Sequence, residues 1–499
     1  MTESMRTAPR GGEHIVTKLR GNLGLISIAF MVVAGAAPLT VVGGPVPLAF
    51  AFGNGAGVPA MFVVTGIILA IFAVGFTTMS RHVPSAGALY AYAYVGIGRR
   101  TGMGTGYAAL LSYMCLYVGV YGLLGPALGD LVVSFHGPDL PWWLWSCAAL
   151  LAVSLIGHRN VEFSGRILGL LLVAEIVITV ALNAVVISTN AHGKGLSTAW
   201  ADPAVFTSGA PGVAFLFAVL GFIGFEATVV FRDEARNPDK TVPRATYLAV
   251  AFIGVFYALT SWAMVSAIGD ADVAAVSAAA PADVLPMLAG QYLGSIGTSL
   301  IRVLFVTSIF ACILTFHNVV ARYMFSLANR SLLPKLLARV HPRYKSPHTA
   351  GVATAMTALV SVALALALKL SPIEEFYTWL VGLASLGYVL LLLVASVSVI
   401  AFFARRPDLR LGSWRTRIAP LLGLVGLLVT LLVILANLSL LVGGHTGVAI
   451  GIVILLIAAF ALGPAVAAVR PRSGREAELS PTSKTPHQDV NDPTEKEGH

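Results

Sequence analysis

Apolar runs of about 20 residues recur along the whole chain and are separated by short polar segments. As a helix, such a run crosses the roughly 30 Å of hydrocarbon in a bilayer. The pattern therefore predicts twelve spans, at residues 22–50, 57–79, 102–128, 142–157, 166–189, 211–231, 245–268, 297–327, 350–369, 375–403, 417–441 and 446–469. Residues 21–469 form the expected membrane domain, between a polar segment at 1–20 and a disordered tail at 470–499.

Composition and charge placement support this pattern. The chain has 499 residues, of which 57% are hydrophobic and 11% charged, whereas soluble domains carry roughly 25% charged residues. With the N-terminus inside, all but three of the 32 Lys and Arg residues lie on inner segments; Lys194 and Lys369 lie outside and Arg302 lies within a span. This positive-inside bias predicts a cell-membrane protein with both termini in the cytoplasm. It also requires the short fourth span, and it accounts for the net charge of +9 without a nucleic-acid partner.

Two spans contain residues that interrupt helices. The first combines Gly35, Pro38 and a Gly43–Pro47 segment, and the sixth carries Gly221, Gly224 and Glu226 at its centre. Unwound backbone is costly in hydrocarbon unless it lines a cavity, so each predicted break implies a site. Helices one and six are also corresponding members of two five-helix halves, at about 22–189 and 211–403, whose topologies are opposite. Paired interrupted helices in inverted repeats indicate a transporter's binding site.

Particular segments give the chain a family resemblance. GFIGFEATVVFRDEARNPDKTVPRA, from Gly221 to Ala245, resembles the sixth helix and following loop of the amino acid, polyamine and organocation transporter superfamily, in particular its bacterial amino acid permeases. PSAGALYAY, from Pro84 to Tyr92, and ARYMFSLANRSLLP, from Ala321 to Pro334, are similar to other family segments. The chain departs from the family at Arg330, where Asp is common, and in AGAAPLT of helix one, where relatives are richer in glycine and serine.

The resemblance implies an all-α, leucine-transporter-type fold. Helices one and six would be discontinuous around a midplane substrate site that helices three, eight and ten complete. A helix N-terminus offers free amides and partial positive charge, so the second half of helix one is expected to bind a substrate carboxylate. Carbonyls at the break in helix six would bind its ammonium. The predicted substrate-binding residues are Val33, Ala34, Gly35, Ala36, Ala37, Tyr113, Tyr117, Phe222, Ile223, Gly224 and Phe225.

The aromatic candidates have two interpretations. Tyr113 and Tyr117 are four residues apart and share a helix face, which is either a cavity wall or an ordinary packing surface. Phe222 and Phe225 carry the same ambiguity, although both flank Gly224.

Two acidic residues inside spans are candidates for coupling or gating. Glu226 adjoins the predicted break in helix six, where it either responds to protons or only closes the break through backbone amides. Glu175 lies near the middle of helix five. It either binds a coupling cation or proton, or is a protonated acid bonded to a neighbouring group; the sequence leaves its facing open.

Other polar residues in spans have simpler interpretations. Arg302 is expected to reach the headgroups, with pairing to Glu175 or to a substrate carboxylate as the alternative, and His317 is expected to be a packed polar residue. Cys115, Cys147 and Cys312 lack metal-ligand spacing, so no metal or cofactor is predicted beyond a coupling proton or sodium ion.

The leading functional hypothesis is secondary transport of an amino acid by alternating access, through proton symport or exchange. Val33, Ala34, Ala36 and Ile223 favour a neutral side chain. An organic amine or polyamine is the alternative substrate, and a channel or sensor is the alternative class. The sequence contains no Walker motif, which argues against an ATP-driven pump. Its spans contain no cluster of catalytic residues, which argues against an intramembrane enzyme. The oligomeric state and coupling ion stay open.

Overall fold

The computed structural model describes residues 23–83, 88–158, 165–341 and 346–469, and these residues form a helical bundle without β-strands. Eleven of its helices are long and apolar enough to cross a membrane, and a shorter apolar helix at Trp142–Gly157 corresponds to the fourth predicted span. The predicted N-terminal segment at 1–20, the tail at 470–499 and part of the PSAGALYAY segment lie outside the described residues.

The spans follow the predicted order, with two of them divided. They are α1 (Leu25–Gly35) with α2 (Pro38–Gly43), α4 (Val58–Met79), α6 (Arg99–Ser134), α7 (Trp142–His158), α8 (Gly165–Ala191), α10 (Pro211–Gly221) with η5 (Phe225–Glu234), α11 (Pro238–Ile268), α13 (Val284–Asn329), α14 (His348–Ala367), α15 (Thr378–Arg405), α16 (Ala419–Leu441) and α17 (Thr446–Val469).

Short elements connect or extend the spans. They are α3 (Pro45–Ala49), η1 (Phe50–Asn54), η2 (Gly55–Gly57), α5 (Ala88–Gly96), η4 (Ala199–Ala201), α9 (Pro203–Thr207), α12 (Val273–Ala279), η6 (Pro281–Asp283), η7 (Lys335–Ala338), η8 (Pro372–Tyr377), η9 (Pro407–Leu409) and η10 (Trp414–Ile418). Between residues 269 and 294 the chain forms α12 and the start of α13, which bends at Gly294. Helix α5 was not among the predicted elements.

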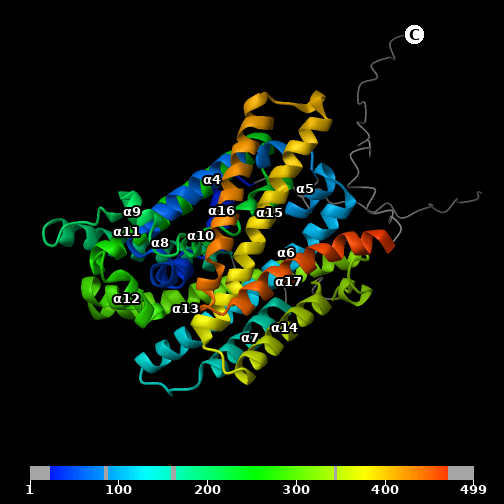
Figure 1. Ribbon diagram of the computed structural model, residues 1–499. Helices are drawn as coiled ribbons and strands as arrows, with labels where there is room; N and C mark the ends of the chain where they lie inside the picture. Colours follow the sequence, from blue (N-terminus) through cyan, green and yellow to red (C-terminus); the bar gives the residue numbers. More distant parts are fainter. Residues whose placement is uncertain (1–22, 84–87, 159–164, 342–345, 470–499) are drawn as a thin grey trace, which may run out of the picture.

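Burial separates central helices from peripheral ones. In the most apolar 18-residue window of α6, 89% of the residues are buried, against 28% in α14 and 22% in α17. Figure 1 shows α17 running alongside α6, and α7 packed against α14 at one edge of the bundle. The exposed leucines and valines of α14, α16 and α17 therefore form surfaces that hydrocarbon would cover.

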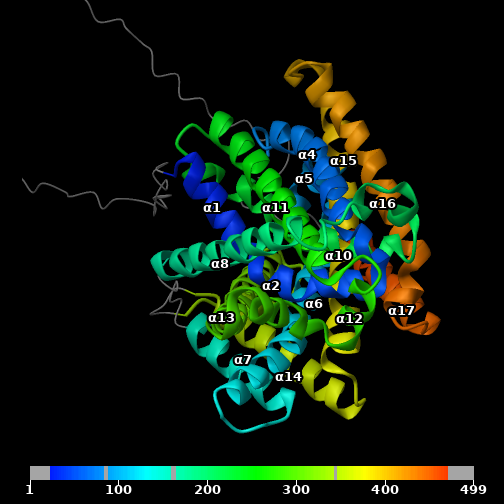
Figure 2. The same cartoon turned by 90° about the vertical axis from the view of Figure 1, so that its left-hand side faces the viewer.

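The first span breaks where proline stops the helix. Pro38 has no N–H, and its ring disfavours helical backbone in the preceding residue. Ala37 accordingly adopts a left-handed conformation, with φ 45° and ψ 72°, between the end of α1 and the start of α2. In Figure 2 the two halves lie on either side of the crossing with α8. The predicted discontinuity of helix one is confirmed.

The sixth span breaks at a glycine. Helix α10 ends at Gly221, Gly224 has φ 110°, and the chain continues as the 3₁₀ helix η5. Only glycine adopts such a backbone conformation at little cost. The discontinuity of helix six is confirmed as well.

Backbone pairing joins the two broken spans near one end of the bundle. The Leu23 N–H donates to the Glu234 carbonyl over 2.9 Å, and the Arg236 N–H donates to the Leu23 carbonyl over 2.9 Å. The start of α1 and the end of η5 are thus tied together by backbone hydrogen bonds.

Candidate functional site

Both breaks leave open space beside the backbone. A Cβ atom added to Gly35 or to Gly224 would meet nothing within 4 Å. Ala34, Gly35 and Gly224 are partly exposed, whereas Val33, Ala36, Ala37 and Ile223 are buried. A small group can therefore approach the backbone at Gly35 and at Gly224.

Glu226 is held at the break in helix six by three donors. Its Oε2 accepts from the Gly224 N–H over 2.9 Å and from the Tyr388 hydroxyl over 2.5 Å, while its Oε1 accepts from the Tyr113 hydroxyl over 2.7 Å. The side chain is buried and forms no ion pair with a described basic residue. The carboxyl joins η5 to α6 and α15, so it links the break to the surrounding helices.

Gly224→Ala is expected to reduce transport because it strains this break. Alanine meets no atom there, so its effect comes only from the φ of 110°, which costs an L-residue roughly 1–3 kcal/mol. Gly451→Ala is the matched control, because a Cβ atom added to Gly451 also meets nothing within 4 Å, its φ is not positive, and it lies in α17 away from both breaks. Uptake into proteoliposomes measures the difference. Equal activity of the two variants would show that the Gly224 geometry is unimportant.

Glu175 faces the break in helix one. Its Oε2 accepts from the Leu39 N–H over 3.3 Å and from the Ser308 hydroxyl over 2.9 Å, which links α8 to α2 and α13. Its Oε1 makes no hydrogen bond to a described residue. The Glu175 side chain, whose direction could not be predicted from the sequence, therefore points inward toward the first residues of α2.

The first amides of α2 already have partners within the protein. Pro38 has no N–H, the Leu39 N–H donates to Glu175, and the Thr40 N–H donates to the Ser308 Oγ over 3.2 Å. The Val41 N–H donates to the Ala37 carbonyl over 3.3 Å. The amides that were expected to receive a substrate carboxylate thus bind the protein's own oxygens, so a carboxylate would have to displace them.

The aromatic candidates divide in their contacts. Tyr113 reaches Glu226, whereas the Tyr117 hydroxyl lies 3.2 Å from that of Tyr121 and 3.1 Å from Nδ1 of His317. Tyr113 is thus brought to the break, and Tyr117 is directed toward α13.

Phe222 and Phe225 turn toward α4 and α11. The Phe222 ring lies between Gly66 and Gly254, each of whose added Cβ atoms would be 3.5 Å from it. The Phe225 ring centroid is 6.1 Å from that of Phe72. Both phenylalanines are buried in packing that anchors the break to its neighbours.

Three polar residues at the breaks were not identified from the sequence. Tyr388 and Ser308 bind the two carboxyls, and the Thr40 hydroxyl donates to Ser308 over 3.0 Å. The sequence indicated a role for these residues only through their positions in helices one, eight and ten. Nothing in the adjoining residues distinguishes them. Arg302 pairs with Asp283 over 3.3 Å and not with Glu175, so the alternative pairing with Glu175 was wrong.

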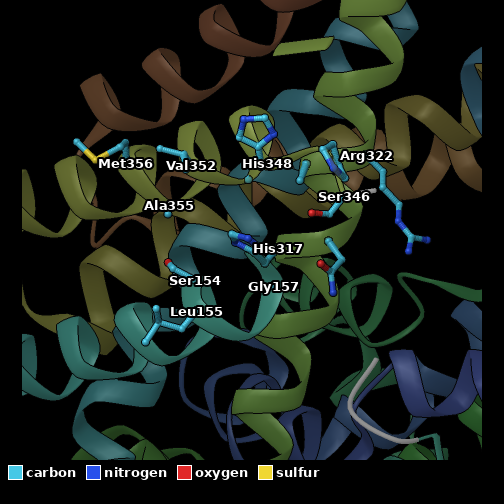
Figure 3. Close-up of a pocket in the computed structure, with 14 residues that line it drawn as sticks. Ser154, Leu155, Gly157, His317, Arg322, Ser346, His348, Val352, Ala355 and Met356 are labelled. Carbon is cyan, nitrogen blue, oxygen red and sulfur yellow. The ribbon is translucent and has the colours of Figure 1, made fainter. Parts of the chain in front are cut away.

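A cavity of about 330 Å³ lies away from the breaks, between α7, α13 and α14 (Figure 3). His317 points into it beside Gly157, with Ser154 below and His348 above in this view. None of the predicted substrate-binding residues lines this cavity. Over the described ranges, no group of three His, Cys, Asp or Glu residues is placed to hold a metal ion.

Comparisons with known proteins identify the family. The amino acid permease family model matches residues 23–460. The branched-chain amino acid permease BcaP of Bacillus subtilis is 24% identical over 71% of this chain and 75% of its own length. The low-affinity putrescine importer PlaP of Escherichia coli is 23% identical over 66% of this chain and 72% of its own.

A solved structure shows the same fold. The manganese transporter of Eremococcus coleocola superposes with a TM-score of 0.54 at 14% identity, covering 90% of this chain and 98% of its own. The family match, the helical spans and the two broken helices agree. The chain belongs to the amino acid permease family, within the amino acid, polyamine and organocation superfamily, and is a multi-pass membrane transporter.

Proposed function

We propose that the chain is a secondary transporter for a small solute with an ammonium group, in the first place an amino acid, and that it works by alternating access. One observation carries this proposal: Glu175 and Glu226 are buried, each beside a helix break, and neither forms an ion pair with a described basic residue. We place it in the cell membrane with both termini in the cytoplasm, as the distribution of basic residues predicts.

Each carboxyl can take a positive partner. A buried carboxylate without a counter-charge is costly even where hydrogen bonds offset part of that cost, so a cation that reaches it is held there. The ammonium group of the solute at Glu226 and a coupling proton or sodium ion at Glu175 would be these partners. Glu226 adjoins the carbonyls of the helix-six break, and the free Oε1 of Glu175 offers an acceptor near helix one. This arrangement favours cation-coupled symport or exchange.

An organic amine is the second candidate. It is favoured by the bonds that the Leu39 and Thr40 amides already make to Glu175 and Ser308, because a solute without a carboxylate leaves them undisturbed. The names of the relatives are consistent with both candidates, since one is a branched-chain amino acid permease and another a putrescine importer.

Counterflow in proteoliposomes separates these possibilities. Vesicles are loaded with neutral amino acids, diamines or monoamines in turn, and entry of the labelled solute is followed with and without a pH gradient. We expect saturable entry that internal amino acid accelerates. Acceleration by amines alone would replace the amino acid proposal with the amine. Entry that no internal solute accelerates would indicate a channel and would overturn the transporter mechanism.

A further inference from the structure

A basic cavity of about 300 Å³ lies where α4 ends and α11 begins, beside η10. Four cationic side chains, from Arg81, Lys240, Arg244 and Arg415, line it together with a single acid, Asp239. Helix α4 packs against both α11 and α16 (Figure 1), so the cavity is built from three spans that are distant in sequence.

The acid does not neutralise the cavity. The Asp239 carboxylate forms an ion pair with Arg232, and the Nε of Arg81 lies 3.8 Å from it. Lys240, Arg244 and Arg415 make no side-chain hydrogen bond or ion pair to a described residue. Three cations are therefore available to an anionic ligand.

His82 lies near Arg81, one of the cationic residues of the cavity. Burial lowers the pKa of His82, and the charges of Arg81, Arg232 and Arg406 lower it further, against the opposing effect of Asp239. The buried Nε of Arg81 also has no hydrogen-bond partner among the described residues.

The surroundings of the cavity are those of a membrane surface. Val74 contributes an apolar side chain to the lining. Two exposed apolar residues adjoin lining residues in the sequence: Leu248 follows Tyr247, and Trp414 precedes Arg415. Leu421, on α16, is exposed as well. Exposed tryptophan is typical of the bilayer interface. A ligand with both an anionic head and apolar tails therefore fits better than a free anion.

We propose that this cavity binds the phosphodiester headgroup of an anionic phospholipid in the leaflet that the charge distribution predicts to be cytoplasmic. Lys240, Arg244 and Arg415 surround the phosphate, and the acyl chains lie along the exposed apolar side chains of α11 and α16. Basic pockets between spans recognise such headgroups, with each basic side chain contributing roughly fivefold in affinity. Because the bound lipid bridges α4, α11 and α16, it stabilises their packing next to the Arg232–Asp239 pair at the end of η5.

Lipid titration of the purified, delipidated full-length chain tests this proposal. Native mass spectrometry would follow the binding of phosphatidylglycerol, with phosphatidylcholine as the neutral lipid and inorganic phosphate as the free anion. Arg244→Gln/Arg415→Gln is expected to weaken phosphatidylglycerol binding by about 30-fold, since two basic contacts are lost. Arg339→Gln/Arg417→Gln removes the same charge from residues outside the cavity lining and is expected to leave that binding within about twofold of the wild type.

Three results would overturn the proposal. Equal losses in the two double variants would show that only total charge matters. Equally tight binding of phosphatidylcholine would remove the role of the basic side chains. Saturation of the cavity by inorganic phosphate in place of the lipid would assign it to a soluble anion.

Discussion

Glu226→Gln is expected to lower uptake at low solute concentration by roughly 10- to 100-fold while the transporter stays folded. A glutamine oxygen can still accept from the Gly224 N–H and the Tyr388 hydroxyl, and its amide can donate to the Tyr113 oxygen. The hydrogen-bond network around the break is therefore kept, and only the negative charge that the solute ammonium would meet is lost.

Counterflow with the purified variant measures this loss, and a thermal unfolding curve in detergent checks the fold. Glu374→Gln is the matched control, because Glu374 is exposed in η8 and outside both breaks. Uptake by Glu226→Gln at the level of this control would mean that Glu226 only closes the break, as the simpler of the two sequence-based interpretations held.

Glu175→Gln is expected to abolish gradient-driven accumulation of the solute while exchange continues. Both hydrogen bonds of Glu175 go to one oxygen, Oε2, so a glutamine oxygen can replace it toward Leu39 and Ser308. The amide group then occupies the place of Oε1, where a proton or coupling cation can no longer be bound. Without that binding step the gradient no longer drives net movement, and the inside-to-outside ratio falls to unity.

Accumulation under an imposed pH or sodium gradient, measured beside counterflow without a gradient, separates coupling from binding. Ser308→Ala is the comparison variant, because it removes a donor to Glu175 but leaves the carboxyl in place. It is expected to retain accumulation. If Glu175→Gln accumulated solute as well as Ser308→Ala, Glu175 would serve only to complete the N-terminus of α2.

The spans and their breaks could be predicted because each depends on local sequence. The length of an apolar run determines whether it crosses the bilayer, and the proline and glycines of spans one and six directly constrain the backbone. The conformation of Ala37 follows from Pro38, and the positive φ of Gly224 from the lack of a side chain.

The direction in which each side chain points could not be predicted. Lipid tails are as apolar as the protein interior, so the buried face of a membrane helix carries little hydrophobic signal. This is why Phe222 and Phe225, predicted at the substrate, pack toward α4 and α11, and why the inward facing of Glu175 stayed open. Tyr388 was missed for the same reason, since its role depends on the approach of α15 to the helix-six break.

An experimental structure with a transported solute bound would locate the substrate site. We expect the solute to contact Glu226, between the Gly35–Ala37 break and the Phe222–Gly224 break. A solute bound instead in the His317 cavity between α7, α13 and α14, with both breaks empty, would contradict this expectation.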